Sequence, residues 1–240
     1  MEVGILTKHT SGLSERVAKE LGLYLWDPSK EGLEAALTRL LPLYDRVLLL
    51  LSRPPFGTHL PLGQALARKH PNRLLLHATP LFGPGLAALA ERAAEEAGQR
   101  EPREVLAEVL RTEREGQLFL ATQEGEKLRA LGWLPPGGGL VLSLGFFALF
   151  TLEGETLRQP PLPVPKGQLP TALARFWGGR FGGKRPRVRL YLGQELWEER
   201  KAFQEALQGL KPERGVFGPL PQVWEEALGS RALLGFAYPP

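Results

Sequence analysis

Residues 3–12 read VGILTKHTSG, an apolar run that stops at hydroxyl-bearing residues and a glycine just before an amphipathic stretch. Residues 47–59 repeat the pattern as VLLLLSRPPFGTH. Each stretch is typical of a buried strand that runs into a loop and then a helix. In an open α/β sheet, ligands bind where the carboxyl ends of strands meet the amino ends of helices. The two stretches therefore predict a binding cleft.

The first half of the chain alternates between strand and helix patterns. Arg46–Leu51 is continuously apolar after its first residue, which is typical of a central parallel strand covered on both faces. A helix over 30–41 carries Leu33, Leu37 and Leu40 on one face. Further strands are expected over 21–25 and 73–77, and further helices over 85–97 and 102–113. We therefore expect a Rossmann-like, three-layer α/β domain with a parallel sheet.

The character of the sequence changes near Gln117, where strand patterns, glycine and proline become more frequent. We expect a protein of the α/β class with two domains, over 1–115 and 116–240, and a ligand cleft between them. The second domain is expected to be α+β, with a mostly antiparallel sheet backed by helices. Its strands are expected over 117–122, 141–152, 188–192, 215–217 and 233–238, and its helices over 169–177 and 194–208.

Two glycine-containing segments predict turns in the second domain. Glu153-Gly154-Glu155 lies between apolar stretches and predicts a hairpin. The run Gly137-Gly138-Gly139 lacks the Lys-Ser/Thr ending of a phosphate-binding loop. We expect this run to form a flexible turn.

The composition limits the chemistry that the chain can perform. No cysteine is present and there are only four histidines, so disulfides, thiolate nucleophiles and thiolate metal sites are excluded and a catalytic metal is not expected. No apolar run approaches the ~20 residues that span a bilayer, and no signal-like segment opens the sequence. We expect a cytoplasmic protein that has no cofactor and no integral membrane association.

Basic residues gather in the second half, although the formal net charge of the chain is only +4. The cluster consists of Arg175, Arg180, Lys184, Arg185, Arg187 and Arg189. It fits either a nucleic-acid footprint or a solvated loop and strand edge. Because no aromatic stacking motif accompanies the charges, we expect a solvated edge and no nucleic-acid partner.

Three strings follow the order of motifs in a known family. Ile5–Leu13 stands where that family has a strand and a Thr-Asp-Ser-Thr-type loop. Tyr44–Thr58 stands where a Tyr-Asp strand leads to Ser-Ser-Gly-Leu-Ser-Gly-Thr, and Leu234–Tyr238 where a Gly-Leu-Ala-Tyr strand closes the chain. On these strings the chain resembles the DegV family of fatty-acid-binding proteins over nearly its whole length. The resemblance implies a long-chain fatty acid or similar amphiphile in an interdomain tunnel, and a carrier that presents it to a fatty acid kinase subunit.

Other family motifs are altered in this chain. Only a short linker and one helix separate Leu25 from Tyr44, where the family has a Thr-Thr-Ser-Gln-Pro-Ser segment that helps to hold the ligand carboxylate. Val223–Glu226 replaces a Gly-Thr-His segment whose histidine contacts the carboxylate, and Leu128–Trp133 replaces an Arg-Gly-Gly-Arg stretch. A family scaffold that no longer binds lipid is therefore an alternative.

A fatty-acid site needs an apolar tunnel for the acyl chain and convergent donors for the carboxylate. We expect Ser52, Thr58 and the backbone amides after Gly57 to supply these donors at a helix amino terminus. Arg53 is a further candidate, since a guanidinium grips a carboxylate through two parallel hydrogen bonds, and an exposed loop charge is the alternative. The other expected ligand-binding residues are His9, Thr10, Ser11 and His59. Thr10 and Ser11 alternatively cap a helix.

The apolar strand that carries Phe146, Phe147 and Phe150 has two interpretations. The three rings line the acyl tunnel, or they fill the core of the second domain. For any one of them, a place in the core is the more common outcome.

Catalysis is the competing class of function. His9 and His59 adjoin the expected cleft loops, and with Ser52 or Ser11 either would form the nucleophile and base of a small hydrolase. No Gly-x-Ser-x-Gly elbow supports this arrangement. We therefore expect a binding protein and not an enzyme.

Overall fold

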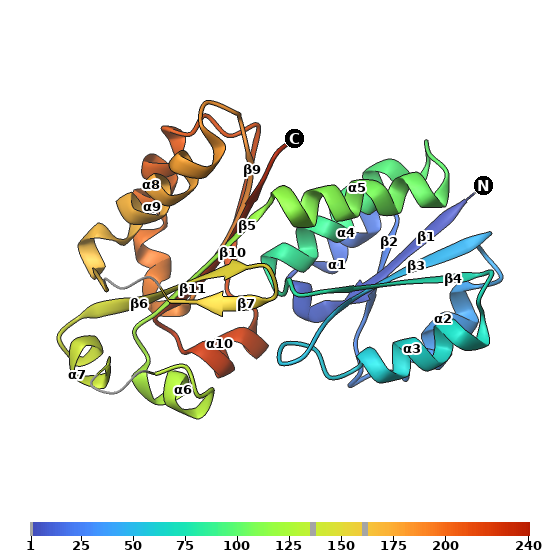
Figure 1. The fold of residues 1–240 in the computed structure, drawn as a ribbon, viewed down its shortest axis with the longest axis horizontal. Coiled ribbons are helices and arrows are strands. Elements are labelled where there is room, and N and C mark those ends of the chain that lie inside the picture. Colours follow the sequence, from blue (N-terminus) through green and yellow to red (C-terminus); the bar gives the residue numbers. More distant parts are fainter. Residues whose placement is uncertain (1, 135–137, 160–162) are drawn as a thin grey trace. The chain divides into compact units, whose positions relative to one another are not determined.

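The structure is a computed structural model that describes residues 2–134, 138–159 and 163–240. The chain divides into two compact units, unit 1 over Met1–Glu115 and unit 2 over Gly116–Pro240 (Figure 1). Each unit has its own β-sheet and its own cluster of buried hydrophobic side chains.

None of the helices in these ranges combines the length and the hydropathy that crossing a bilayer requires.

Unit 1 is built on a four-stranded sheet with the strand order β2-β1-β3-β4, in which every pair is parallel. The strands are β1 (Val3–Lys8), β2 (Leu23–Trp26), β3 (Arg46–Ser52) and β4 (Leu74–Thr79). The helices are α1 (Glu15–Glu20), α2 (Leu33–Leu40), α3 (Leu60–Lys69), α4 (Pro84–Ala97) and α5 (Pro102–Glu115), with a 3₁₀ turn η1 (His9–Ser11). The parallel sheet predicted from the sequence is confirmed, with strand ends displaced by no more than two residues.

Burial explains why this sheet has helices on both faces. The side chains of Val47–Leu50 point alternately to opposite faces of β3, and all four are 0% exposed. On one face they meet α2, whose Leu33, Leu37 and Leu40 are each 1% exposed, as the sequence predicted. α2 begins three residues later than expected because Asp27 accepts hydrogen bonds from Ser29 and holds the preceding segment in a turn.

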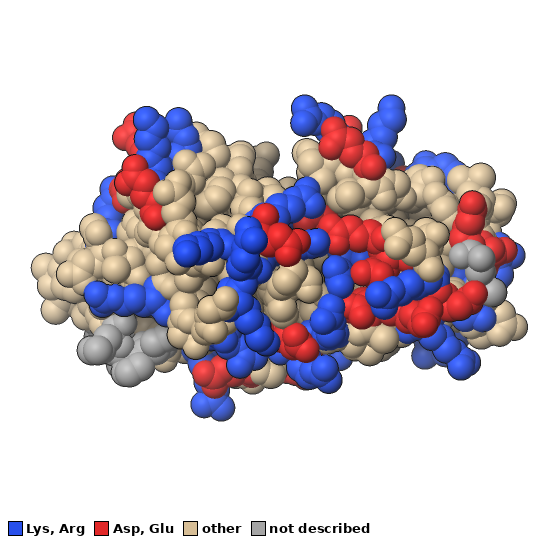
Figure 2. Space-filling view, turned by 90° about the horizontal axis from the view of Figure 1, so that it is seen from above, with Lys and Arg blue, Asp and Glu red and all other residues tan. Residues whose placement is uncertain are grey.

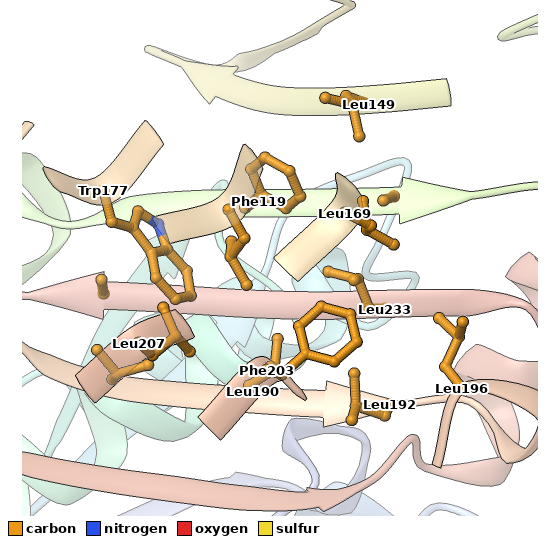
Figure 3. Close-up of a cluster of buried hydrophobic side chains, with 14 of the residues drawn as sticks. Phe119, Leu149, Leu169, Trp177, Leu190, Leu192, Leu196, Phe203, Leu207 and Leu233 are labelled. Carbon is orange, nitrogen blue, oxygen red and sulfur yellow. The ribbon is translucent and has the colours of Figure 1, made fainter. Parts of the chain in front are cut away.

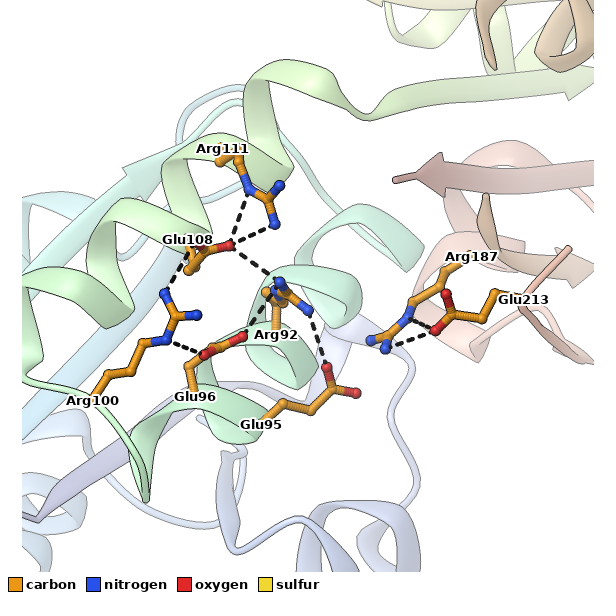
Figure 4. Close-up of polar contacts among 8 residues, drawn as sticks. All are labelled: Arg92, Glu95, Glu96, Arg100, Glu108, Arg111, Arg187 and Glu213. Atoms are coloured by element: carbon orange, nitrogen blue, oxygen red, sulfur yellow. Dashed lines mark hydrogen bonds and ion pairs between the residues drawn. The ribbon is translucent and has the colours of Figure 1, made fainter. Parts of the chain in front are cut away.

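An ion-pair network joins α4 to α5 (Figure 4). Arg92 lies 3.3 Å from Glu96 of its own helix and 3.2 Å from Glu108 of α5. Arg100 contacts the same two carboxylates at 2.7 and 3.3 Å, and Arg111 contacts Glu108 at 2.8 Å. Glu96 and Glu108 are only 12% and 17% exposed, so these charges are fixed by one another and only partly screened by water.

Unit 2 contains a seven-stranded sheet with the order β10-β9-β11-β5-β6-β7, and β8 pairs with β6 outside this path. β9 and β10 are parallel, and the other pairs are antiparallel. The strands are β5 (Gln117–Thr122), β6 (Phe146–Glu153), β7 (Thr156–Arg158), β8 (Val164–Pro165), β9 (Arg187–Leu192), β10 (Arg214–Pro219) and β11 (Ala232–Tyr238). The helices are α6 (Gly125–Ala130), α7 (Gly138–Ser143), α8 (Leu169–Phe181), α9 (Arg200–Gln208) and α10 (Gln222–Leu228), with 3₁₀ turns η2 (Lys166–Gln168) and η3 (Gln194–Glu199). The predicted α+β unit with a mostly antiparallel sheet is confirmed, and so is the hairpin at Gly154.

The core of unit 2 lies between one face of its sheet and helices α8 and α9 (Figure 3). Trp177 of α8 and Phe203 of α9 are 0% exposed and meet Phe119 and Leu190 of the sheet. Phe147, also 0% exposed, belongs to this cluster and therefore fills the core.

The strand expected over 141–152 is wrong in its first part. Gly138–Ser143 forms α7, and Gly145, with a φ of +90°, separates it from β6. An apolar run of this length does not distinguish helix from strand by its periodicity, so the helix was missed. The flexible turn expected over the glycine run is also wrong for Gly138 and Gly139, which begin α7, whereas Gly137 lies outside the described residues.

The helix expected over 194–208 is likewise two elements. Gln194–Glu199 is the 3₁₀ turn η3, and the α-helix proper begins only at Arg200. The expected boundary was therefore correct at the carboxyl end and six residues early for the α-helix.

The basic cluster is not simply a solvated edge. Arg189 of β9, which lies between β10 and β11 in the sheet, is 4% exposed and donates a hydrogen bond to Tyr191 Oη at 3.0 Å. Arg187 pairs with Glu213 at 3.1 Å (Figure 4). Arg175, Arg180, Lys184 and Arg185 are exposed, as expected. On the face in Figure 2, basic and acidic side chains are interspersed.

Candidate functional site

The two loops that the sequence singled out are neighbours in unit 1. β1 and β3 are adjacent parallel strands, so their carboxyl ends meet at the same edge of the sheet. β1 leads into η1, and β3 leads into the loop before α3. We call this region the carboxyl edge, and define it by residues 8–12, 26–27, 52–59 and 79–81.

Ser52 and Arg53 fasten the loop after β3 to the end of β4. Ser52 Oγ donates a hydrogen bond of 2.7 Å to the backbone oxygen of Leu81. The backbone N–H of Arg53 donates to Thr79 O at 2.7 Å, and its Nε donates to Ala78 O at 2.8 Å. A hydroxyl has a single hydrogen, so Ser52 in this arrangement donates to the protein and not to a ligand. The Nη1 and Nη2 groups of Arg53 carry further donors.

Gly57 allows the rest of this loop to turn tightly. The N–H groups of Phe56 and Gly57 both donate to Arg53 O, at 3.0 and 2.9 Å. A Cβ at Gly57 would lie 1.9 Å from the backbone oxygen of Ser52, so only glycine fits. Thr58 follows at the surface, with its Oγ1 at 3.2 Å from His59 Nδ1. The tight turn thus places the exposed hydroxyl of Thr58 at the amino terminus of α3.

The loop after β1 is fastened on the other side, towards β2. His9 Nδ1 lies 3.4 Å from the backbone oxygen of Trp26 and 3.7 Å from Asp27 Oδ1. Ser11 is 0% exposed and its Oγ accepts a hydrogen bond from the N–H of Leu13 at 3.4 Å. The cap of α1 is Ser14, not Thr10 or Ser11. Ser11 therefore stabilises its own turn and is closed to a ligand as it stands.

Burial and charge shift the titration of two basic groups at this edge. Burial lowers the pKa of Lys8, and the nearby carboxylate of Asp27 opposes that shift. Burial, and then the charge of Lys8, lower the pKa of His59, whose ring packs edge-on against Trp26 at 4.8 Å. The ends of β1, β2 and β3 are thus linked through Lys8, Trp26 and His59.

Sequence inspection missed a buried polar group behind Arg53. His77 of β4, 8% exposed, has its Nε2 at 2.7 Å from Glu113 Oε2 of α5. Burial alone would raise the pKa of Glu113, but hydrogen bonds from His77 and Thr79 and the charges of His77 and Arg53 hold it below the ordinary value. Glu113 is a half-buried counter-charge for Arg53. No local motif marks it, because its partners lie on other elements.

The nucleophile and base of a hydrolase are not assembled at the carboxyl edge. Ser52 is hydrogen-bonded to Leu81 O and Ser11 to Leu13 N, and neither is bonded to a histidine in the described ranges. Across the same ranges, no three His, Asp or Glu side chains are grouped as metal ligands.

No protein-family model and no curated protein matches the sequence. Among solved structures, a DegV family protein from Thermus thermophilus, described for its fatty acid binding, superposes with a TM-score of 0.86 and 18% identity over 100% of both chains. The chain has the DegV fold. A DegV family protein from Corynebacterium glutamicum gives 0.84 at 17% identity, covering 99% of this chain and 97% of its own. One from Eubacterium eligens, loaded with heptadecanoic acid, gives 0.76 at 10% identity, covering 99% and 100%.

On this DegV fold, all of the expected ligand-binding residues lie at the carboxyl edge, but in two groups. Ser52–Thr58 is tied to β4, whereas His9–Ser11 is tied to β2, and His59 reaches Trp26 from the β3 side. Their contact with a ligand stays a prediction.

Proposed function

We propose that this protein binds a long-chain fatty acid or a similar amphiphile and acts as its carrier, not as a catalyst. The observation that carries the proposal is the end-to-end match of the DegV fold, at 18% identity or less, to proteins described as fatty acid binding. One of the matching structures is loaded with heptadecanoic acid.

Arg53 and Thr58 are the proposed partners of the ligand carboxylate. Arg53 stands on a loop that is held by two bonds to β4, and Thr58 presents a hydroxyl at the amino terminus of the ten-residue helix α3. A guanidinium and a carboxylate form short, charge-assisted hydrogen bonds, and a helix amino terminus favours negative charge. Ser52 is assigned a supporting role, because its hydroxyl hydrogen is already donated to Leu81 O.

The acyl chain would supply most of the affinity. Each methylene removed from water contributes about 0.8 kcal/mol, so the carboxylate contacts select the head group while the tail provides the driving force. Removing Arg53 should therefore weaken carboxylates selectively and leave the binding of an uncharged analogue, such as the corresponding alcohol, nearly unchanged.

The test combines native mass spectrometry with extraction of the purified protein. We expect a fatty acid at one per chain, and we expect Arg53→Ala to weaken palmitate by about tenfold or more. Arg68→Ala is the matched control, since Arg68 is an exposed arginine on α3. A purified protein that contains no fatty acid and does not bind added fatty acid would contradict the proposal.

A scaffold without lipid binding is the second candidate. It is favoured by the state of two expected donors: Ser52 Oγ already donates to Leu81 O, and Ser11 is 0% exposed, with its Oγ accepting from Leu13 N–H. An empty protein in the same experiment would support it.

Delivery to a kinase is the finer part of the proposal. A carrier that presents its carboxylate for phosphorylation must leave the head group accessible, which the exposed position of Thr58 would allow. The test is transfer of phosphate from ATP to protein-bound palmitate by a fatty acid kinase subunit. Absence of transfer with a loaded protein would remove this role and leave the carrier role intact.

A further inference from the structure

Thr79, the last residue of β4, joins the loops that follow β3 and β4. It is 0% exposed and lies opposite Ser52 in the pairing of β3 with β4. Its backbone oxygen accepts the N–H of Arg53 at 2.7 Å, and its Oγ1 accepts the N–H of Leu81 at 3.1 Å. One buried residue is therefore bonded to both loops.

The bond from Leu81 to the Thr79 hydroxyl fixes the start of the loop after β4. A hydroxyl that accepts the N–H two residues further along the chain holds the backbone in a small local turn. The same Leu81 accepts, through its backbone oxygen, the hydrogen of Ser52 Oγ at 2.7 Å. These bonds link Ser52, Arg53, Thr79 and Leu81 into one closed network, so the two loops are held as a single unit.

The Thr79 hydroxyl also donates a hydrogen bond. Burial raises the pKa of Glu113 of α5, but hydrogen bonds from His77 and Thr79 more than offset that effect. His77 Nε2 holds the same carboxylate at 2.7 Å. The hydroxyl thus accepts from Leu81 and donates to Glu113. A side chain of the same shape without the oxygen would leave both partners with one hydrogen bond fewer.

This network bears on ligand binding through Arg53. Its N–H is held by Thr79 O and its Nε by Ala78 O, at 2.7 and 2.8 Å. Ordering a long side chain costs conformational entropy, and a group that is already held when the ligand arrives loses less of it on binding. The affinity of Arg53 for a carboxylate therefore depends on how firmly the end of β4 holds the loop.

We infer that Thr79 is a positioning residue of the proposed carboxylate site, which holds Arg53 and Ser52 in place for the head group and does not contact the ligand itself. The inference rests on the proposed function. Because Thr79 acts through the partners of the carboxylate, its loss should weaken ligands that carry a carboxylate more than ligands that share only the acyl chain.

Unit 2 provides a matched control for Thr79. Thr122, the last residue of β5, is also 0% exposed. Its Oγ1 accepts the N–H of Glu124, again two residues further on, at 3.1 Å and donates to Leu228 O at 2.7 Å. The two threonines make the same kinds of bond, but these bonds of Thr122 lie within unit 2. Thr122→Val should therefore cost stability without changing the choice between ligands.

The test compares the affinity of the full chain for palmitate with its affinity for 1-hexadecanol, by equilibrium binding of the radiolabelled ligands. Thr79→Val replaces the hydroxyl by a methyl group and should lower the ratio of the two affinities by about fivefold, as the loss of one hydrogen bond does. Thr79→Ser keeps the hydroxyl and should restore the ratio. In the Arg53→Ala background, Thr79→Val should lower the ratio no further, because its effect runs through Arg53.

A second measurement needs no variant. Thr79 bonds to the N–H groups of Arg53 and Leu81, so bound palmitate should slow hydrogen exchange at both amides, although Leu81 is not a proposed ligand contact. Slowing at Arg53 alone would overturn the inference and leave the proposed function intact. So would an equal change of the affinity ratio in Thr79→Val and Thr122→Val. A wild-type protein that does not bind palmitate would overturn both.

Discussion

His77 Nε2 of β4 and Glu113 Oε2 of α5 lie 2.7 Å apart behind the loop that carries Arg53. An ionised carboxylate only accepts hydrogen bonds, so His77 Nε2 carries the shared hydrogen. The pair ties a helix to the strand that anchors Arg53, because Arg53 Nε bonds to Ala78 O, next to His77 in β4. Arg53, the candidate carboxylate partner, is thus supported by a half-buried charge on α5.

Glu113→Gln should destabilise unit 1 by about 1–3 kcal/mol at neutral pH, because it removes the charged partner of His77 and Thr79. The folded-state pKa of Glu113 is below the ordinary 4.5, so this stabilisation is fully present above that pH and is lost as the pH falls through the folded value. Urea unfolding at pH 7 and pH 3 measures the difference. Equal destabilisation at both pH values would contradict an electrostatic role.

Gly57→Ala should destabilise the loop after β3 by about 1–3 kcal/mol, since its Cβ would lie 1.9 Å from Ser52 O and the loop would have to open. Gly98→Ala is the control, because a Cβ there meets no atom within 4 Å. Thermal unfolding compares the two variants. If Gly57→Ala were as stable as the control, the tight turn would be wrong.

Arg92→Met should cost about 1–3 kcal/mol, because Glu96 and Glu108 would then face each other with one cation fewer between them. The cost should shrink in high salt, which screens the repulsion. Arg16→Met provides the comparison. Arg16 is 85% exposed and its pair with Glu20 lies on the surface, so its loss should hardly change the free energy of unfolding. Urea is the appropriate denaturant, because guanidinium chloride is itself a salt and would screen the charges under test.

Gly235→Ala should destabilise unit 2, because its Cβ would lie 2.8 Å from the ring of Trp177. Trp177→Phe makes room for that methyl group and also removes an indole N–H that finds no acceptor among the described residues. We therefore expect the double variant to be more stable than the sum of the single effects, by about 1 kcal/mol or more. Strict additivity in urea unfolding would show that Trp177 is not the obstacle.

The fold could be predicted where a run of consecutive apolar residues marks a buried strand. β3 is apolar from Val47 to Leu51, a pattern typical of a strand covered on both faces. The short helices α6 and α10 could not be predicted in this way, because helices of six or seven residues depend on tertiary packing and not on their own sequence. α7 was mistaken for a strand because it too is short, and its apolar residues fit either kind of element.

The candidate site was predictable only in its position. The carboxyl ends of β1 and β3 were located from strand and loop patterns, and they are adjacent. The bond from Ser52 to Leu81 joins residues 29 positions apart, and that from His77 to Glu113 joins residues 36 apart. Side-chain pairs of this kind follow from the packing of whole elements, so no local motif could show that Ser52 is already engaged.

The position of β11 delays completion of the unit 2 sheet during synthesis. β11 lies between β9 and β5, so the middle of the unit 2 sheet stays open until Ala232–Tyr238 has left the ribosome. Unit 1 has all of its strands once Thr79 has emerged. β5 pairs with β6 on one side, but its other side must wait for β11, and such non-local pairing is slow. We therefore expect a stage of synthesis in which all described strands of unit 1 have emerged while one side of β5 is still unpaired, and an unpaired strand edge favours aggregation.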